Sequence, residues 1–261
     1  GRMQQYINVS VSVVIPAKNE ANNLPHVLPR IPKWVHEVIL VDGFSSDNTI
    51  EVARSLRPDI KIITQQRKGK GAALRSGFSA CEGDIVVMLD ADGSMDPSEI
   101  PAYVGALLAG ADFVKGSRFM QGGRTDDMEW YRRFGNWSFV MLVKLRFGGR
   151  FSDLCYGYIG FWRSALNKLS LEKDDGFEIE TSMNVQALTT GLVVHEVPSI
   201  EAPRIHGVSN LRTIPDGWRV LKTILRLSFF RAATQAKGAQ DRRPGPIVPI
   251  PLEVTVTHKP G

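Results

Sequence analysis

The stretch Asp84-Ile85-Val86-Val87-Met88-Leu89-Asp90-Ala91-Asp92-Gly93-Ser94 decides which fold this chain is expected to adopt. A continuous apolar run bounded by turn signals is typical of a strand that is buried on both faces of a sheet. Residues that follow such a strand emerge into the crevice in which open α/β sheets bind ligands. Asp90 and Asp92 would share one face of an extended chain, where their carboxylates repel unless a cation lies between them. Such oxygen ligands suit Mg²⁺ or Mn²⁺, which would also hold nucleotide phosphates. An acidic turn that caps the next helix, near 97–99, is an equally good reading of this stretch alone.

Alternating strand and helix patterns surround this stretch. Strand patterns cover 11–16, 38–42, 60–63, 85–89, 112–115 and 192–197, with an extended segment at 157–162. Helix patterns cover 19–28, 50–56, 72–80, 99–108, 132–147, 178–190 and 215–231. This alternation indicates βαβ units and therefore a mostly parallel sheet. The Gly-rich polar segment 121–130 is expected to be a mobile loop.

The domain organisation follows from where these patterns stop. We expect one α/β domain over residues 1–231 and an extended C-terminal arm over 232–261, which is rich in Gln, Arg, Pro and Gly. The arm is a candidate segment for contacts in a homo-oligomer.

Composition limits the classes of function. A hydrophobic content of 43% and a charged content of 23% over 261 residues are ordinary for a globular protein. The net charge of +5 fits an anionic partner such as phosphates or a membrane surface. Nucleic acid is disfavoured, because no aromatic-basic platform or known nucleic-acid motif is present. Two cysteines, Cys81 and Cys155, supply neither a disulfide framework nor a zinc-ligand set. No apolar run is long enough to span a bilayer, so we expect a cytoplasmic protein, with peripheral contact at the cytosolic membrane face as an option.

Polar residues follow three of the predicted strands. They are Pro16 to Glu20, Asp42, and the pair Asp90 and Asp92. Parallel strands bring these ends to one edge of the sheet, so the three groups are expected to converge. A loop with the sequence Lys-Gly-Lys-Gly at 68–71 lies among them in the chain.

Eight motifs stand in order along residues 11–225. They are Val-Val-Ile-Pro-Ala-Lys-Asn-Glu (13–20), Val-Asp-Gly-Phe-Ser-Ser-Asp-Asn-Thr (41–49), Gly-Lys-Gly-Ala-Ala-Leu-Arg-Ser-Gly (69–77), Leu-Asp-Ala-Asp-Gly (89–93), Lys-Gly-Ser-Arg-Phe (115–119), Ser-Asp-Leu-Cys-Tyr-Gly-Tyr (152–158), Gly-Phe-Glu-Ile-Glu-Thr (176–181) and Arg-Ile-His-Gly-Val-Ser-Asn-Leu (204–211). Together they resemble the family 2 glycosyltransferases of the GT-A fold, in which helices flank a mostly parallel central sheet. The closer pattern resembles the dolichol-phosphate mannose synthase branch, which moves a sugar from a nucleotide to a polyprenyl phosphate.

The resemblance implies a role for each matching residue on the donor side. Pro16, Glu20 and Asp42 would hold the base and ribose of a nucleotide sugar. Lys70 would neutralise phosphate or the leaving nucleotide. Asp90 and Asp92 would bind the donor and Mg²⁺ or Mn²⁺, with Asp92 the main metal ligand and a catalytic residue.

On the acceptor side, the resemblance implies two further acids and a set of phosphate-binding residues. Asp153 and Glu180 are the other catalytic candidates, and a hydroxyl acceptor would require one of them to take a proton. A phosphate acceptor is already ionised, and they would then only position the sugar. The residues expected to grip an acceptor phosphate are Arg118, Arg133, Arg204 and Ser209.

Two positions depart from the pattern of the mannose synthases. Asn210 stands where a lysine is usual, and Gly43 stands where a second acid usually follows Asp42. The donor, of the GDP-mannose or UDP-glucose type, and the acceptor therefore stay open. Our hypothesis is a metal-dependent, inverting transfer of a hexosyl group to a polyprenyl phosphate. The alternatives are a soluble hydroxyl acceptor with the same donor chemistry, and a nucleotide-binding module without turnover.

The helical pattern at 215–231 carries a basic stripe, Arg219, Lys222 and Arg226, beside apolar residues. Such a helix either packs on its own domain, which is the commoner case, or lies in a membrane interface. The segment 137–147 allows the same two readings.

Overall fold

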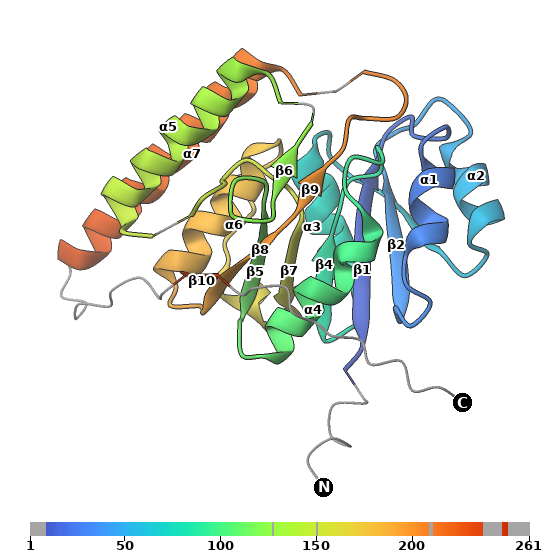
Figure 1. Ribbon diagram of the computed structural model, residues 1–261, viewed down its shortest axis with the longest axis horizontal. Helices are drawn as coiled ribbons and strands as arrows, with labels where there is room; N and C mark the ends of the chain where they lie inside the picture. Colours follow the sequence, from blue (N-terminus) through green and yellow to red (C-terminus); the bar gives the residue numbers. More distant parts are fainter. Residues whose placement is uncertain (1–8, 127, 150, 209–210, 237–246, 250–261) are drawn as a thin grey trace, which may run out of the picture.

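The computed structural model describes residues 9–126, 128–149, 151–208, 211–236 and 247–249. Within these ranges, eight strands form one sheet in the order β10-β8-β5-β7-β4-β1-β2-β3 (Figure 1). The strands are β1 (Val11–Ala17), β2 (Glu37–Asp42), β3 (Lys61–Thr64), β4 (Ile85–Met88), β5 (Phe113–Ser117), β7 (Ile159–Trp162), β8 (Val194–Pro198) and β10 (Ile247–Pro249). β7 pairs antiparallel with β4 and β5, and every other pair in this sheet is parallel. The expectation of a mostly parallel α/β sheet is confirmed.

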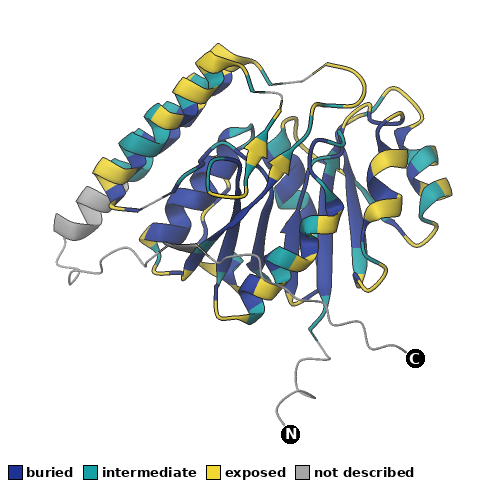
Figure 2. Cartoon of the chain, in the orientation of Figure 1, coloured by how far each residue is buried: buried dark blue, intermediate teal, exposed yellow. Residues whose placement is uncertain are grey.

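Helices cover both faces of the sheet, as the pattern of the strands requires. They are α1 (Leu24–Val27), α2 (Thr49–Leu56), α3 (Lys70–Ala80), α4 (Ile100–Leu108), α5 (Trp130–Phe147), α6 (Glu178–Thr189) and α7 (Thr213–Ala236). Successive side chains of β1 point to opposite faces: Val14 joins the core under α3 and α6, whereas Val13 and Ile15 join the core under α1, α2 and α4. The central strands are therefore buried along their length, which Figure 2 shows as dark blue arrows.

The element formed by residues 19–28 differs from the expected helix. Its helical part is limited to α1, and a short 3-10 helix, Leu28–Arg30, follows. Pro25 and Pro29 each stand near the first position of one of these short segments, where a missing N–H is tolerated. Asn19 has a φ of +57°, a left-handed conformation that does not fit into an α-helix. The expected helix therefore cannot include Asn19.

The expectation of a loop over 121–130 is wrong at the centre of that segment. Strand β6 (Arg124–Thr125) pairs in parallel with β9 (Ile200–Glu201), a strand that the sequence pattern missed. The backbone N–H of Asp126 also donates to the carbonyl oxygen of Glu201, at 3.1 Å. This two-stranded ribbon fixes both segments above the carboxyl ends of the main sheet strands.

Helices α5 and α7 lie side by side on the outer side of α6 (Figure 1). Helix α7 continues past Arg231 to Ala236, and β10 adds a parallel strand beside β8. The remainder of the expected arm, 237–246 and 250–261, lies outside the described residues. Across the described part of the chain, no helix combines the length and the apolar character needed to cross a membrane.

Candidate active site

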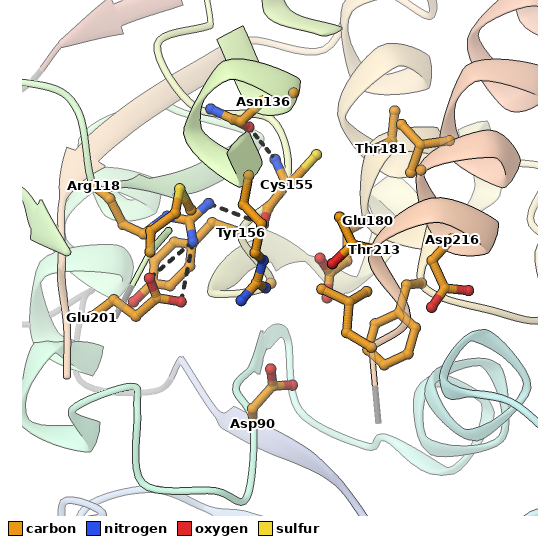
Figure 3. A pocket seen from close by; sticks show the side chains of 18 of the residues that line it. Asp90, Arg118, Asn136, Cys155, Tyr156, Glu180, Thr181, Glu201, Thr213 and Asp216 are labelled. Atoms are coloured by element: carbon orange, nitrogen blue, oxygen red, sulfur yellow. Dashed lines mark hydrogen bonds and ion pairs between the residues drawn. The ribbon is translucent and has the colours of Figure 1, made fainter. Parts of the chain in front are cut away.

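Two cavities meet at the carboxyl ends of β1, β2 and β4, where the sequence predicted a site. The strand-side cavity, about 560 Å³, is lined by Pro16, Glu20, Phe44 and their neighbours. The helix-side cavity, about 280 Å³, extends towards α5 and α7 and is the one shown in Figure 3. Five residues line both cavities and mark their junction: Lys70, Asp90, Asp92, Phe177 and Arg204.

Lys70 bridges two carboxylates at this junction. Its Nζ lies 2.6 Å from Asp90 Oδ1 and 2.6 Å from Glu180 Oε1. Burial alone would lower the pKa of Lys70, but the two carboxylates hold that pKa above its ordinary value. Burial, together with the charges of Asp92 and Glu180, raises the pKa of Asp90 to about 6 in spite of the lysine. Burial and the two neighbouring acids therefore outweigh the effect of Lys70 on the pKa of Asp90.

The two glycines that flank Lys70 explain how this side chain is positioned at the start of α3. The Gly71 N–H donates to the carbonyl oxygen of Asp175 at 2.9 Å, and a Cβ at Gly71 would lie 2.0 Å from the Asp174 carbonyl oxygen. Gly69 has a φ of +114°, a conformation that side chains disfavour. The Gly-Lys-Gly sequence thus lets the backbone pass close to the loop that precedes α6.

Arg204 holds the second pair of acids. Its Nη2 lies 2.5 Å from Glu20 Oε1, and its Nη1 lies 3.3 Å from Asp92 Oδ2. The other oxygen of Asp92 accepts hydrogen bonds from the backbone N–H and the hydroxyl of Ser94. Asn23 accepts from the backbone N–H of His206 at 2.9 Å, which ties the segment carrying Arg204 to α1.

Asp90 and Asp92 could together hold one divalent cation. Both line the junction, and each now contacts a cationic side chain, Lys70 or Arg204. Within the described ranges, no group of three or more His, Cys, Asp or Glu side chains is arranged to hold a metal ion. Two carboxylates fit Mg²⁺ or Mn²⁺ when phosphates and water complete the coordination. The residues present are therefore sufficient for a metal that is shared with a phosphate ligand.

On the strand side, Asp42 is buried, and it is not among the residues that line the cavity. Its Oδ2 accepts a hydrogen bond from the Ser45 N–H at 3.2 Å, and its Oδ1 has no hydrogen-bond partner in the structure as described. Phe44, which sequence reasoning missed, does line the cavity; it is 49% exposed and has a φ of +60°. A positive φ is rare for an aromatic residue and clusters at ligand sites.

On the helix side, Arg118 forms ion pairs with two carboxylates, those of Asp153 and Glu201. Asp153 is fully buried and accepts from Nε at 2.7 Å and from Nη2 at 2.9 Å. Glu201 accepts from Nη1, and Figure 3 shows this contact. Burial would raise the pKa of Asp153, but Arg118 holds it below its ordinary value. The ring of Tyr156 lies 4.7 Å from the guanidinium carbon and covers its face. Sequence reasoning missed Glu201, because the two-residue strand that carries it has no periodicity.

The two neighbouring arginines of α5 differ in position. Arg132 lines the helix-side cavity, and no described side chain forms a hydrogen bond or an ion pair with it. Arg133, the residue expected from the sequence, is exposed, is not part of the cavity wall and lies over the ring of Phe119 at 5.5 Å. Ser209 lies outside the described residues.

Each described carboxylate in the wall of the helix-side cavity is paired with a cation. The carboxylates are those of Asp90, Asp92, Glu180, Glu201 and Asp216, and a Lys or Arg nitrogen lies within 3.3 Å of each. Apolar side chains, among them Phe139 and Val220, complete the wall between α5 and α7. The cavity therefore combines paired charges at the junction with an apolar region towards the helices.

Comparisons with known proteins place these features in a family. A sequence model described as "Glycosyl transferase family 2" matches residues 12–170. The dolichol-phosphate mannosyltransferase of Pyrococcus furiosus is 30% identical over 215 residues, which are 78% of this chain and 60% of that protein. The polyprenol monophosphomannose synthase of Mycolicibacterium smegmatis is 32% identical over 211 residues, 76% of this chain and 80% of that protein.

A solved structure of glucosyl-3-phosphoglycerate synthase from Mycobacterium tuberculosis, in complex with Mn²⁺, uridine diphosphate and glucosyl-3-phosphoglycerate, has a similar fold. The TM-score is 0.66 at 24% identity, over 84% of this chain and 80% of that chain. This likeness confirms the expected GT-A fold.

Proposed function

Because this chain belongs to glycosyl transferase family 2, we propose that it is a metal-dependent, inverting glycosyltransferase that moves a hexosyl group from a nucleotide sugar to a polyprenyl phosphate. One observation carries the choice of acceptor: each described carboxylate that lines the helix-side cavity is paired with a cation. A hydroxyl acceptor needs a free base, whereas a phosphate is already ionised and needs none. The similarity to enzymes named for dolichol-phosphate and polyprenol substrates supports the same choice.

The strand-side cavity is proposed as the donor site. Pro16 and Glu20 would contact the ribose, and the exposed ring of Phe44 could stack on the base. Asp42, with one buried oxygen free of hydrogen bonds within the described structure, would accept from the base after a small movement of the strand end. Lys70 would offset phosphate charge at the junction.

Asp90 and Asp92 are proposed as the residues that hold Mg²⁺ or Mn²⁺. When bound, the ion would stabilise the negative charge that grows on the diphosphate leaving group. Structures with the same fold were solved with Mn²⁺ or Mg²⁺ and uridine diphosphate, which supports a divalent ion here. Lys70 and Arg204 would then turn from these acids to the phosphates.

The acceptor phosphate is proposed to bind in the helix-side cavity, near Arg118, Arg132 and Arg204. Arg132 replaces Arg133 in this proposal, because only Arg132 lines the cavity. Asp153 and Glu180 are proposed as positioning residues: the first orients Arg118, and the second orients Lys70. An apolar chain could leave this site between α5 and α7, over the apolar part of the wall.

Peripheral membrane contact is proposed for the outer side of α5 and α7. Helix α7 packs its inner face on its own domain, as Val220 and Ile224 are buried. Its outer face still exposes large apolar residues, and so does that of α5: Trp130, Phe134, Trp137 and Leu145 on α5, and Ile214, Trp218 and Phe229 on α7. Basic side chains of the same helices would face anionic lipid headgroups. Under this proposal, the two readings of the amphipathic pattern would apply to different faces of one helix.

The deciding experiment is a transfer assay with labelled GDP-mannose or UDP-glucose, Mn²⁺ and a short polyprenyl phosphate. Label that moves to the organic phase supports the proposal and identifies the donor. Asp92→Asn should lower transfer by about 10²–10³-fold, since charge stabilisation at the leaving group is lost. Its unfolding should change little, because Asn can still accept both bonds from Ser94. Full transfer by this variant would refute the proposed site. Label in a water-soluble product would instead support a hydroxyl acceptor.

A further inference from the structure

Each of the three guanidinium nitrogens of Arg118 already donates to an acceptor in this structure. A guanidinium group has five N–H donors. Three of them meet Asp153 and the Cys155 carbonyl oxygen, at 2.7, 2.9 and 3.1 Å. Nη1 donates to the Glu201 carboxylate, whose Oε1 and Oε2 lie at 3.1 and 3.0 Å. An anion that binds Nη1 of Arg118 therefore competes with Glu201 for that nitrogen.

The two carboxylates around Arg118 differ in how easily they can be displaced. The Asp153 side chain is 0% exposed, whereas that of Glu201 is 19% exposed and forms part of the cavity wall. Figure 3 shows Glu201 beside Arg118 at the cavity. A buried charge without a partner is costly, so Asp153 cannot leave Arg118. Glu201 can move towards solvent. Thr125 Oγ1 donates at 2.6 Å to Glu201 Oε2, an oxygen that also accepts from Nη1.

We propose that Glu201 is an internal anion that competes with the acceptor's phosphate for Nη1 of Arg118 and thereby sets acceptor specificity. This inference rests on the proposed function, because it concerns the acceptor end of that site. The oxygens of a phosphate can accept from Nη1 in place of the carboxylate oxygens. A neutral hydroxyl compound cannot replace the charge that Glu201 supplies, so it leaves Glu201 in place. A phosphate monoester brings its own charge and can take over Nη1.

Arg132 is the second arginine that would contact the incoming phosphate. It lines the same cavity and has no hydrogen-bond or ion-pair partner among the described side chains. An incoming phosphate can therefore contact Arg132 before Glu201 moves, and Arg118 completes the site once Glu201 has turned away. In the native protein, the free energy needed to displace Glu201 weakens phosphate binding. Removal of the Glu201 charge should therefore increase the affinity for phosphate.

The test is the affinity for inorganic phosphate, measured by calorimetric titration of the full chain without donor. Glu201→Gln should bind phosphate about tenfold more tightly than the native protein, the size expected for one charge-assisted hydrogen bond. The amide oxygen can still accept from Nη1, so Arg118 should keep its position. Glu172→Gln is the matched control: it removes the same charge from an exposed residue that does not line the cavity, and its phosphate affinity should not change.

If Glu201 served only to orient Arg118, the results would differ. Glu201→Gln would then bind phosphate equally or less tightly, and either result overturns the proposal. Thr125→Val provides a second test, because it loosens Glu201 and leaves every charge in place. It should tighten phosphate binding by a smaller factor, and unchanged or weaker binding in this variant contradicts displacement. In transfer assays, Glu201→Gln should lower the KM for the acceptor more than it changes kcat.

Two further arms separate the sources of phosphate and the two proposals. If Glu201→Gln also binds a short prenyl monophosphate about tenfold more tightly, the phosphate site at Arg118 is assigned to the lipid headgroup. Tighter binding of inorganic phosphate alone overturns that assignment. Transfer to polyprenyl phosphate by the native enzyme, without any gain in phosphate affinity for Glu201→Gln, refutes the role of Glu201 alone. A gain in affinity without such transfer refutes the proposed acceptor, and the anion exchange at Arg118 stands.

Discussion

Replacement of Lys70 with Met is the sharpest test of the charge arrangement at the junction. The variant keeps the apolar stem and removes the ammonium group that lies 2.6 Å from both Asp90 and Glu180. Among the described residues, this leaves both carboxylates without a cationic partner. Loss of one member of a buried ion pair costs about 3–5 kcal/mol. The contact of Lys70 with the Phe177 ring, 5.5 Å from Nζ to the centroid, adds about 0.5–1 kcal/mol.

Urea unfolding at neutral pH measures this loss. Lys33→Met, at an exposed residue away from both cavities, is the control and should stay within about 0.5 kcal/mol of the native protein. Glu180→Gln in the Lys70→Met background should return part of the lost stability, since one uncompensated charge disappears. The coupling energy of the two changes should lie at about 1–3 kcal/mol. A loss below about 1 kcal/mol for Lys70→Met, with no coupling to Glu180, would refute the bridging role of Lys70.

Three other predictions follow from individual contacts. Arg132→Met should raise the KM for the acceptor about tenfold, whereas Arg133→Met should leave it nearly unchanged; equal effects on KM would count against the choice of Arg132. Burial raises the pKa of Glu196 above its ordinary value of 4.5, so its ionised form costs stability above that pH. Glu196→Gln should therefore unfold at a higher temperature than the native protein at neutral pH, and the gain should vanish as the pH falls to about 4.5; a gain that grows on acidification contradicts this reasoning. Gly71→Ala should cost about 3 kcal/mol in urea unfolding, because the new Cβ would lie 2.0 Å from a backbone carbonyl oxygen. Gly105→Ala, in a helix with open space around the new methyl group, should instead gain about 0.5–1 kcal/mol, and similar effects of the two changes would argue against this packing.

Much of the sheet could be predicted from the sequence because its central strands are apolar runs bounded by turn signals. β4 is an unbroken apolar run, and all four of its residues are buried. β2 ends on Asp42 as expected, and β1 begins at Val11 as expected. Two-sided burial favours such runs, and their short length and flanking turn residues identify these strands. The convergence of Asp90, Asp92 and Lys70 then follows from the parallel order of the strands.

The choice between Arg132 and Arg133 could not be made in the same way. Adjacent residues of an α-helix point in directions about 100° apart, so a motif that is matched to within one residue does not identify the side that faces a cavity. The direction depends on how α5 docks against α7, and that contact is set by residues far away in the sequence. Phe44 was missed for a related reason, since its backbone has a positive φ that no local pattern announces.

Glu201 illustrates a third limit. Its strand has two residues, too few for a periodic pattern, and its partner strand lies in a segment that is polar and rich in glycine. Its importance comes from its contact with Arg118, which is 83 residues away in the chain. Contacts of this kind depend on the complete fold. Sequence patterns therefore identify the acids at the strand ends and miss Glu201, the acid that contacts Arg118.

The same charge arrangement bears on the acids that a hydroxyl acceptor would need as a base. Asp153 is fully buried against Arg118, and Glu180 is buried against Lys70. Protonation of Asp153 would weaken its buried ion pair with Arg118 at a cost in free energy, and Glu180 already contacts the ammonium group of Lys70. The low pKa of Asp153 expresses this cost directly, because Arg118 opposes its protonation. Since an acceptor phosphate needs no base, Glu180→Gln should retain far more transfer to polyprenyl phosphate than the loss of a catalytic base would allow. A loss of 10²-fold or more, with the fold intact, would assign Glu180 to the chemistry and reopen the case for a hydroxyl acceptor.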